Sequence, residues 1–290
     1  MVDQPFSAEE NFKKPSPDEI ADTIHLVRPI PQVALKIARM TNEGDYDMGE
    51  IAGEIKQDQV ISARIITLSN SSFIGLRKKI DSIERALVVL GDKLLIQVVL
   101  SASLDLYFSE ALQGYSLCKG GLFNHAMGTA MVAEKLAEYT NRASPGVAYT
   151  AGLLHDIGKV VLDQYISAAF PFFYRRTQID RVEICEAENE KFGITHPEAG
   201  GLLAENWSLP ANLTDAIRYH HYPESATVAH KLTHLVYLAD LLMNRFQAGR
   251  GLECLNMDKL SLRLQKVGLT TSQFPIIVDL IPERVFLDLP

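Results

Sequence analysis

The 290-residue chain has little of the chemistry that marks secreted or membrane proteins. Its three cysteines, Cys118, Cys185 and Cys254, are odd in number and form no CxxC pair, so no disulfide framework is predicted and we expect free thiols that are wholly or partly buried. No stretch approaches the roughly 20 uninterrupted apolar residues of a membrane helix. The N-terminal MVDQPFSAEENFKK also lacks the apolar core of a signal peptide. These absences predict a cytoplasmic protein that does not bind membranes.

Positive charge is also scarce. The chain has 28 Lys and Arg residues against 36 Asp and Glu residues, for a net charge of -8. That balance opposes broad attraction to nucleic-acid backbones or anionic lipids. The sequence has no glycine-rich phosphate loop, no nucleophilic serine elbow and no dinucleotide fingerprint, so the common enzyme classes built on these motifs have no support.

The composition is that of a globular protein, with 47% hydrophobic and 22% charged residues. Apolar residues recur at helical spacing, as in Val33, Ile37 and Met40, and there is no sustained alternation of period 2 and no hairpin signal. Helix starts are marked by Ser16 before Pro17 and by Thr195 with Glu198, which has the spacing of a capping box. We therefore predict an all-α fold.

The helical pattern is interrupted once by a glycine-rich run, which predicts two halves. An N-terminal helical bundle is expected over residues 17–112, a connector over 113–121 and a second helical unit over 122–246. The remaining residues, 247–290, mix a helical pattern with proline-flanked apolar runs and are expected to pack on the core as a tail.

Histidines and aspartates gather in the second half, at or beside predicted helix ends or on helix faces. The set is His125, His155, Asp156, His196, His220, His221 and Asp240. Each residue alone is weak evidence for a metal site, because a buried histidine is more often a hydrogen-bonded core residue. A pair of histidines at a helix end, however, can aim two imidazoles at one centre. Together, five imidazoles and two carboxylates suit iron, manganese, zinc or nickel. One bridging aspartate plus three further ligands for each metal would fill two adjacent sites.

Lys159 follows His155 by four residues and Asp156 by three, so it shares their helical face if the helix continues. It would then reach a phosphate or a metal-bound water, although a solvated surface lysine is an equally good interpretation.

Other residues fit no part of this pattern. Trp207 is interpreted as a core anchor, and an acidic run is interpreted as a solvated helix face. That run comprises Glu183, Glu186, Glu188 and Glu190, while the histidines outside the pattern are His25, His230 and His234.

The segment GLLHDIGK at 152–159 resembles the metal-binding signature of the HD superfamily of metal-dependent phosphohydrolases. The matching ligands are His125, His155, Asp156 and Asp240, and the additional histidines His196, His220 and His221 are similar to the second-metal ligands of the binuclear HD-GYP branch. This resemblance implies one metal on the first four ligands and another on Asp156 with the additional histidines. Asp156 would bridge the two metals.

Several further motifs resemble the HDOD domain over roughly residues 24–223. They are LVRPIPQVALKIARM, QDQVISARIITLSNSSFIG, SIERALVVLG and AENWSLPANLTDAIRYHHYP. The resemblance implies an N-terminal helical bundle packed with an HD-type helical subdomain, and a role in bacterial signalling or regulation. Many HDOD domains lack the metal ligands, whereas this chain has the whole set. No Gly-Tyr-Pro segment follows His221, which speaks against cyclic dinucleotide hydrolysis.

Two functions follow from these residues and from the resemblance. The first is a free-standing regulatory HDOD protein with a binuclear site, holding two divalent ions, iron or manganese before zinc or nickel, and acting through a signalling protein or a small phosphorylated ligand. The alternative is a metal-dependent phosphohydrolase acting on a phosphoester or nucleotide. There, Asp156 would hold the metals that activate a water, and Lys159 would stabilise charge on the phosphoryl oxygens.

Overall fold

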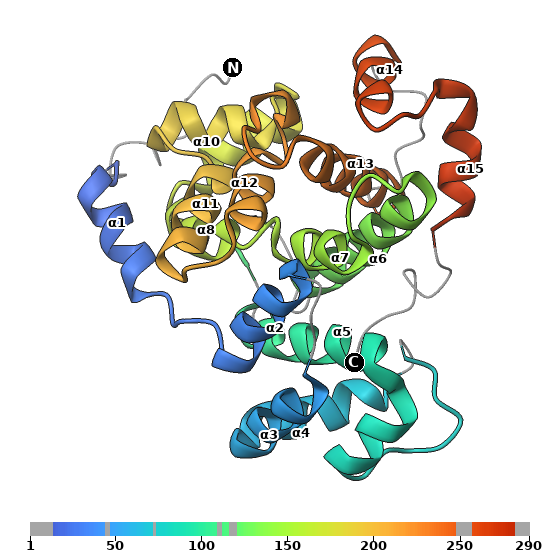
Figure 1. Ribbon diagram of the computed structural model, residues 1–290. Coiled ribbons are helices and arrows are strands. Elements are labelled where there is room, and N and C mark those ends of the chain that lie inside the picture. Colours follow the sequence, from blue (N-terminus) through green and yellow to red (C-terminus); the bar gives the residue numbers. More distant parts are fainter. Residues whose placement is uncertain are drawn as a thin grey trace, which may run out of the picture.

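The computed structural model describes residues 14–43, 47–71, 74–108, 112–115, 121–247 and 257–281. Every regular element within these ranges is helical, which confirms the predicted all-α fold (Figure 1). The helices before the connector are α1 (Pro17–Leu26), α2 (Gln32–Glu43), α3 (Met48–Gln57), α4 (Gln59–Ser69) and α5 (Ile83–Phe108).

The elements after the connector form the second half and the tail. The second half contains α6 (Gly121–Thr140), α7 (Pro145–Leu154), α8 (Gly158–Ala168), α9 (Phe170–Tyr174), the π-helix η2 (Arg175–Ile179), α10 (Ile184–Phe192), α11 (His196–Asn206), α12 (Ala211–Tyr219), the 3-10 turn η3 (Pro223–Ser225) and α13 (His230–Gln247). The tail contains α14 (Met257–Lys266), the 3-10 turn η5 (Thr271–Gln273) and α15 (Phe274–Asp279).

Side-chain caps begin the helices where the sequence predicts them. The Ser16 hydroxyl accepts a hydrogen bond from the Glu19 amide, and the Glu19 carboxylate accepts one from the Ser16 amide. Thr195 and Glu198 form the same reciprocal cap at the start of α11. Such caps satisfy amide groups that the first helical turn leaves unpaired. The cap at Thr195 fixes where α11 begins and hence where His196 lies.

Helix α5 is the most apolar element and lies largely inside the fold. Among the described residues it is the one helix whose length and composition would allow it to cross a membrane, but 61% of its apolar window is buried within the protein. Leu95, Val99, Leu104 and Phe108 are at most 1% exposed. Gly91 breaks the helix with a left-handed φ of 68°, a conformation that glycine adopts without steric penalty. The apolar character of α5 is thus that of a core helix.

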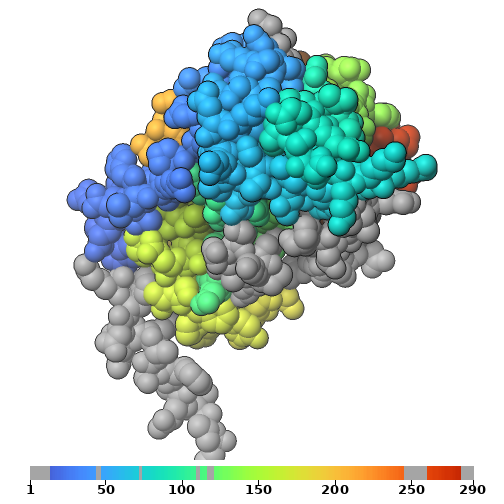
Figure 2. All heavy atoms as spheres, turned by 90° about the horizontal axis from the view of Figure 1, so that it is seen from below, coloured from blue at the N-terminus to red at the C-terminus, as the bar shows by residue number. Residues whose placement is uncertain are grey.

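The two halves are packed against each other along several helices. In the second half, α6, α7 and α13 contact one another, and α11 contacts both α8 and α12. From the first half, α1 lies against α8 and α11 (Figure 1). The Trp207 ring, 4% exposed, lies 5.5 Å from the Tyr107 ring of α5, which confirms its prediction as a core anchor. In the view from below, helices of the first half cover much of the surface, in blue and teal (Figure 2).

The described part of the tail packs on the second half. Leu260, Leu264 and Ile277 are buried, and α14 contacts α13. Of the three cysteines, Cys185 is a buried free thiol, as predicted, while Cys118 and Cys254 lie outside the described residues.

Candidate metal centre

The residues of the GLLHDIGK motif form a tight turn between two helices. Helix α7 ends at Leu154, α8 begins at Gly158, and His155 and Asp156 lie in the turn. A Cβ added to Gly152 would lie 2.8 Å from the Ala130 Cα of α6, and one added to Gly158 would overlap the His196 carbonyl of α11. These two glycines therefore allow α6 and α11 to approach the turn closely enough to bring their histidines to Asp156.

Asp156 lies at the centre of the cluster and is 1% exposed. Its Oδ1 lies 3.3 Å from His196 Nε2 and 3.6 Å from His220 Nε2. Its Oδ2 lies 3.4 Å from His155 Nε2 and 3.6 Å from His125 Nε2. The two carboxylate oxygens thus face different histidines, which is the arrangement that a bridging carboxylate requires.

On the Oδ2 side, a group of three side chains comes from three separate elements. His125 projects from α6, His155 from the turn and Asp240 from α13, and their ligand atoms lie within 4.8 Å of one another. His125 Nε2 is 2.9 Å from Asp240 Oδ1, and His155 Nε2 is 3.5 Å from the same oxygen. All three residues are buried. Their ligand atoms therefore lie close together and away from solvent, as the ligands of a metal site do.

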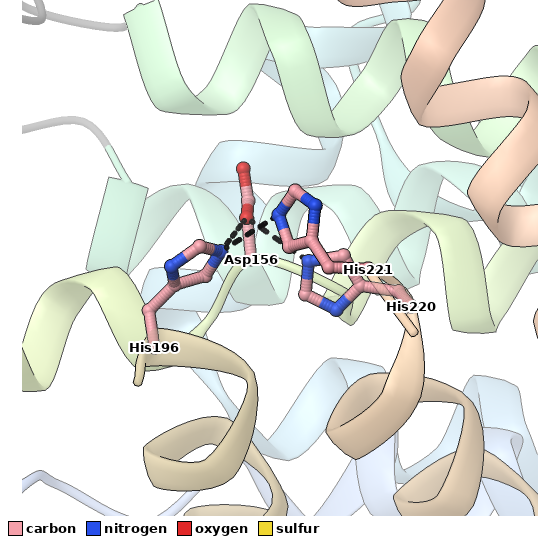
Figure 3. A group of neighbouring side chains, drawn as sticks. All are labelled: Asp156, His196, His220 and His221. Atoms are coloured by element: carbon pink, nitrogen blue, oxygen red, sulfur yellow. Dashed lines mark hydrogen bonds and ion pairs between the residues drawn. The ribbon is translucent and has the colours of Figure 1, made fainter. Parts of the chain in front are cut away.

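On the Oδ1 side, Asp156 lies with three histidines (Figure 3). His196 is the first residue of α11, and His220 and His221 follow the end of α12, so the helix ends aim all three imidazoles at Asp156. The four ligand atoms lie within 4.8 Å of one another, and His221 Nε2 is 3.2 Å from His196 Nε2. The structure thus brings all seven predicted ligands into one cluster with two lobes.

Two of the imidazoles are oriented by a hydrogen bond at Nδ1, the ring nitrogen that does not face Asp156. Nδ1 of His155 lies 2.7 Å from the Gly152 carbonyl and Nδ1 of His220 lies 2.7 Å from the Ile217 carbonyl. A carbonyl only accepts, so each Nδ1 donates, and each ring in its neutral form presents the lone pair of Nε2 to the centre. Histidine ligands of metals are oriented in this way by a carbonyl or carboxylate on the other nitrogen.

The chemistry of the cluster fits a divalent transition metal. Asp156 Oδ1 and His220 Nε2 are buried and have no hydrogen-bond partner within the described part of the chain. A buried polar atom without a partner is costly, and a cation would satisfy both atoms. Imidazole nitrogen together with carboxylate oxygen suits iron, manganese, zinc or nickel.

The cluster also concentrates opposite charges away from water. Burial opposes the charge on Asp156, yet His155 and Lys159 hold its pKa well below the ordinary value. Burial also opposes charge on His155, but the carboxylates of Asp156 and Asp240 raise its pKa to about 9. Burial lowers the pKa of His220 to about 4. A cation entering such a site must replace protons on imidazoles, because only the neutral ring is a ligand.

Lys159 lies beside the cluster rather than in solvent. Its Nζ is 2.5 Å from Asp156 Oδ2, and its side chain is 16% exposed. Burial opposes its charge, but Asp156 outweighs burial and raises the pKa of Lys159. The alternative interpretation, a solvated surface lysine, is therefore wrong. Asp156 lies in the turn before α8, so the two residues do not share one continuous helical face as predicted, and the turn brings Asp156 to Lys159. The ion pair with Asp156 gives Lys159 a structural role as well.

Sequence reasoning missed Glu188, the residue that orients His196. The acidic run was expected to be solvated, but Glu188 is 0% exposed and its Oε2 lies 2.9 Å from His196 Nδ1. Burial alone would lower the pKa of His196, whereas Glu188 holds it well above the ordinary value. The available signal was helical spacing, because Glu188 lies three residues after Cys185 and four before Phe192 on one buried face of α10.

The remaining side chains of that run and of the histidine set behave as predicted. Glu183, Glu186 and Glu190 are exposed. Three histidines fall outside every group of potential metal ligands among the described residues; they are His25, His230 and His234.

Comparison with known proteins identifies related chains. The HDOD domain family model matches residues 27–223. An uncharacterised protein from Treponema pallidum is 28% identical over 207 residues, which are 70% of this chain and 39% of the relative. The chain therefore spans about two fifths of the length of that curated relative.

Two solved structures share the fold. An HDOD domain protein of unknown function from Geobacter sulfurreducens is 26% identical, with 93% of this chain and 97% of that chain covered and a TM-score of 0.72. A protein from Marinobacter aquaeolei, provisionally assigned to signal transduction, is 23% identical, with 96% of this chain and 61% of that chain covered and a TM-score of 0.74. The same arrangement of helices therefore occurs in chains with quite different sequences.

Proposed function

Because the chain belongs to the HDOD domain family, we propose that it is a bacterial regulatory protein whose second half holds two divalent transition-metal cations. The observation that carries this proposal is the position of Asp156, whose two oxygens face two different groups of imidazole nitrogens. A structural carboxylate needs only one set of partners. A carboxylate at the boundary of two complete ligand groups has the geometry to bridge two cations.

Each cation would have its own set of ligands. His125, His155 and Asp240 with Oδ2 of Asp156 would hold one, and His196, His220 and His221 with Oδ1 of Asp156 would hold the other. Iron or manganese suits these ligands first, followed by zinc or nickel. When bound, a cation pair of this kind neutralises negative charge and makes a water acidic.

Regulation would come from contact with a signalling protein or a small phosphorylated ligand. Membership of the HDOD family supports this proposal, and so does the shared fold of the Marinobacter protein. The packing of the halves also supports it, because Tyr107 of α5 contacts Trp207 and α2 contacts α7. Binding of such a partner to the first half could therefore change the structure of the second half, which would hold the cations.

Removal and return of metal tests the cation sites. A ligand present at 100 times its Kd stabilises a folded protein by about 2.7 kcal/mol. In a protein of this size that corresponds to a rise in Tm of roughly 5 °C for each filled site. We therefore expect Mn²⁺ to raise the Tm of the chelator-treated protein, as measured by calorimetry, and expect His155→Ala to lose about half of this rise, the share of the one site that His155 serves.

His234→Ala is the matched control, because His234 is also a buried histidine, 3% exposed, but lies outside the cluster. It should lower the Tm while keeping the full rise on adding Mn²⁺. An equal rise in wild type and His155→Ala would show that Mn²⁺ binds elsewhere.

The second candidate function is a metal-dependent phosphohydrolase, and the position of Lys159 favours it. The Lys159 ammonium lies beside Asp156 and near the ring of Tyr115, where it could stabilise negative charge on phosphoryl oxygens. A phosphate monoester or diester of a nucleotide is a better candidate substrate than a cyclic dinucleotide, because the sequence has no Gly-Tyr-Pro segment after His221.

For this candidate we expect turnover of p-nitrophenyl phosphate or its bis ester that depends on Mn²⁺. Lys159→Met should lower kcat by about 100-fold or more, as removal of a charge-stabilising donor does. Metal content measured on the same samples should stay near that of wild type. Absence of turnover by the Mn²⁺-loaded wild type would rule out these substrates and leave the regulatory proposal standing.

A further inference from the structure

The first residues of the connector are bound directly to the second half. The first residues of the connector, 113–115, place the Gly114 amide 2.9 Å from Oδ1 of Asp163 on α8, and the Tyr115 amide 3.4 Å from the same oxygen. Gly114 has no room for a side chain, because an added Cβ would lie 2.5 Å from the Asp163 carbonyl. In Figure 2 this segment is a small green patch among yellow-green residues of the second half.

Tyr115 extends this contact to the cluster through Glu188. The Tyr115 hydroxyl donates a hydrogen bond of 2.7 Å to Oε1 of Glu188. Oε2 of Glu188 accepts from the His196 amide at 2.8 Å and from His196 Nδ1 at 2.9 Å. Glu188 is completely buried, so these contacts are made out of reach of solvent. The hydroxyl on the connector thus fixes the carboxylate that fixes the imidazole.

This chain of contacts ends on one lobe of the cluster. His196 belongs to the lobe with His220 and His221, whereas the other lobe is built from α6, α13 and the His155 turn. The aromatic ring of Tyr115 makes separate contacts, edge-on to His196 and 5.6 Å from Nζ of Lys159. Replacing Tyr115 by phenylalanine keeps the ring and removes only the hydroxyl.

We infer that Tyr115 is a positioning residue through which the connector controls the affinity of the cation held by His196, His220 and His221. The inference rests on the proposed pair of cation sites. A partner that displaces the connector withdraws the hydroxyl from Glu188 and weakens this one cation. By thermodynamic reciprocity, the cation in turn stabilises the docked connector. The connector is therefore a route, beside the packing of the halves, by which the first half and the metal centre regulate each other.

Titration of metal-free protein with Mn²⁺, followed by calorimetry and by electron paramagnetic resonance of the free ion, tests this inference. In Tyr115→Phe we expect the Kd of one of two ions to rise about tenfold and the other to change less than about twofold, since orienting partners of metal ligands contribute roughly 10- to 100-fold. Glu188→Gln should weaken the same ion by a factor in that range. Glu186→Gln, on the exposed side of α10, should change neither.

Tyr149→Phe is the control for a lost buried hydroxyl. Tyr149 lies on α7, and its hydroxyl is 2.9 Å from Oγ of Ser101 on α5. This variant should lose stability but keep both Mn²⁺ affinities. Equal weakening of both ions in Tyr115→Phe, matched by Tyr149→Phe, would reduce Tyr115 to a structural residue and overturn the inference.

Hydrogen exchange of the Gly114 and Tyr115 amides gives a readout that a structural role would not produce. In wild type, saturating Mn²⁺ should slow their exchange, measured by mass spectrometry. In Tyr115→Phe, Mn²⁺ that fills both sites should no longer do so. If wild type binds two ions and neither the Kd nor the exchange responds to Tyr115→Phe, the inference fails alone. If wild type binds no Mn²⁺, the proposed cation sites are wrong, and the inference that depends on them is wrong as well.

Discussion

Replacing Gly158 by alanine is expected to lower the free energy of unfolding by about 3 kcal/mol or more, the upper part of the range for overpacked cores. The added Cβ would overlap the His196 carbonyl and lie 2.5 Å from the Gly200 amide nitrogen. Both are backbone atoms, so no side chain can rotate to make room, and α8 and α11 must separate. Separation would carry His196 away from Asp156 and reduce cation binding as well as stability.

Gly53→Ala is the matched control for this substitution. Gly53 lies in α3 and is exposed, and a Cβ added there would have no neighbouring atom within 4 Å. Alanine is favoured over glycine in a helix by about 0.8–1 kcal/mol, so this variant should be slightly stabilised. Urea unfolding followed by circular dichroism measures both changes. A Gly158→Ala protein within about 0.5 kcal/mol of wild type, the size of an ordinary surface substitution, would contradict the close helix contact.

Replacing Asp156 by asparagine is expected to remove both cations, so that the metal content falls from near two ions per chain to near zero. The side chain keeps its shape, but one oxygen becomes an NH₂ group that donates hydrogen bonds and cannot bind a cation. The remaining amide oxygen is neutral and faces only one lobe. A ligand that serves both lobes thus has a larger effect than a ligand that serves one.

His220→Ala provides the comparison, because His220 belongs to the lobe that faces Oδ1 alone. It should leave about one ion per chain. Loss of a buried charge from a hydrogen-bonded pair can itself cost about 3–5 kcal/mol, so each variant must first show a single cooperative urea transition. Loss of only one ion in folded Asp156→Asn would mean that this carboxylate does not bridge the lobes.

Much of the fold and the ligand set could be predicted because helix ends leave local marks in the sequence. The Thr195 cap fixes the first turn of α11 at His196, and Pro145 and Gly158 bound the helices around the His155 turn. A side chain at the end of a helix can point along the helix axis, so ligands from three helix ends can meet at one point. The resemblance to HD-type sequences then indicates which residues converge.

The supporting residues could not be predicted because their roles depend on contacts between distant segments. Glu188 lies in an acidic run whose composition favours solvent, and only the packing of α10 buries it. Tyr115 lies in a connector with no helical pattern, and its hydroxyl meets Glu188 from 73 residues away in the chain. The close contact of Gly158 with α11 could not be predicted either, because it depends on the positions of both helices.

An anomalous difference map from a crystal of Mn²⁺-loaded protein, purified without a chelator or a histidine tag, would show whether Asp156 bridges two cations. We expect two peaks, one facing Oδ1 of Asp156 among His196, His220 and His221, and one facing Oδ2. A single peak, or peaks away from Asp156, would contradict a carboxylate that bridges two cations.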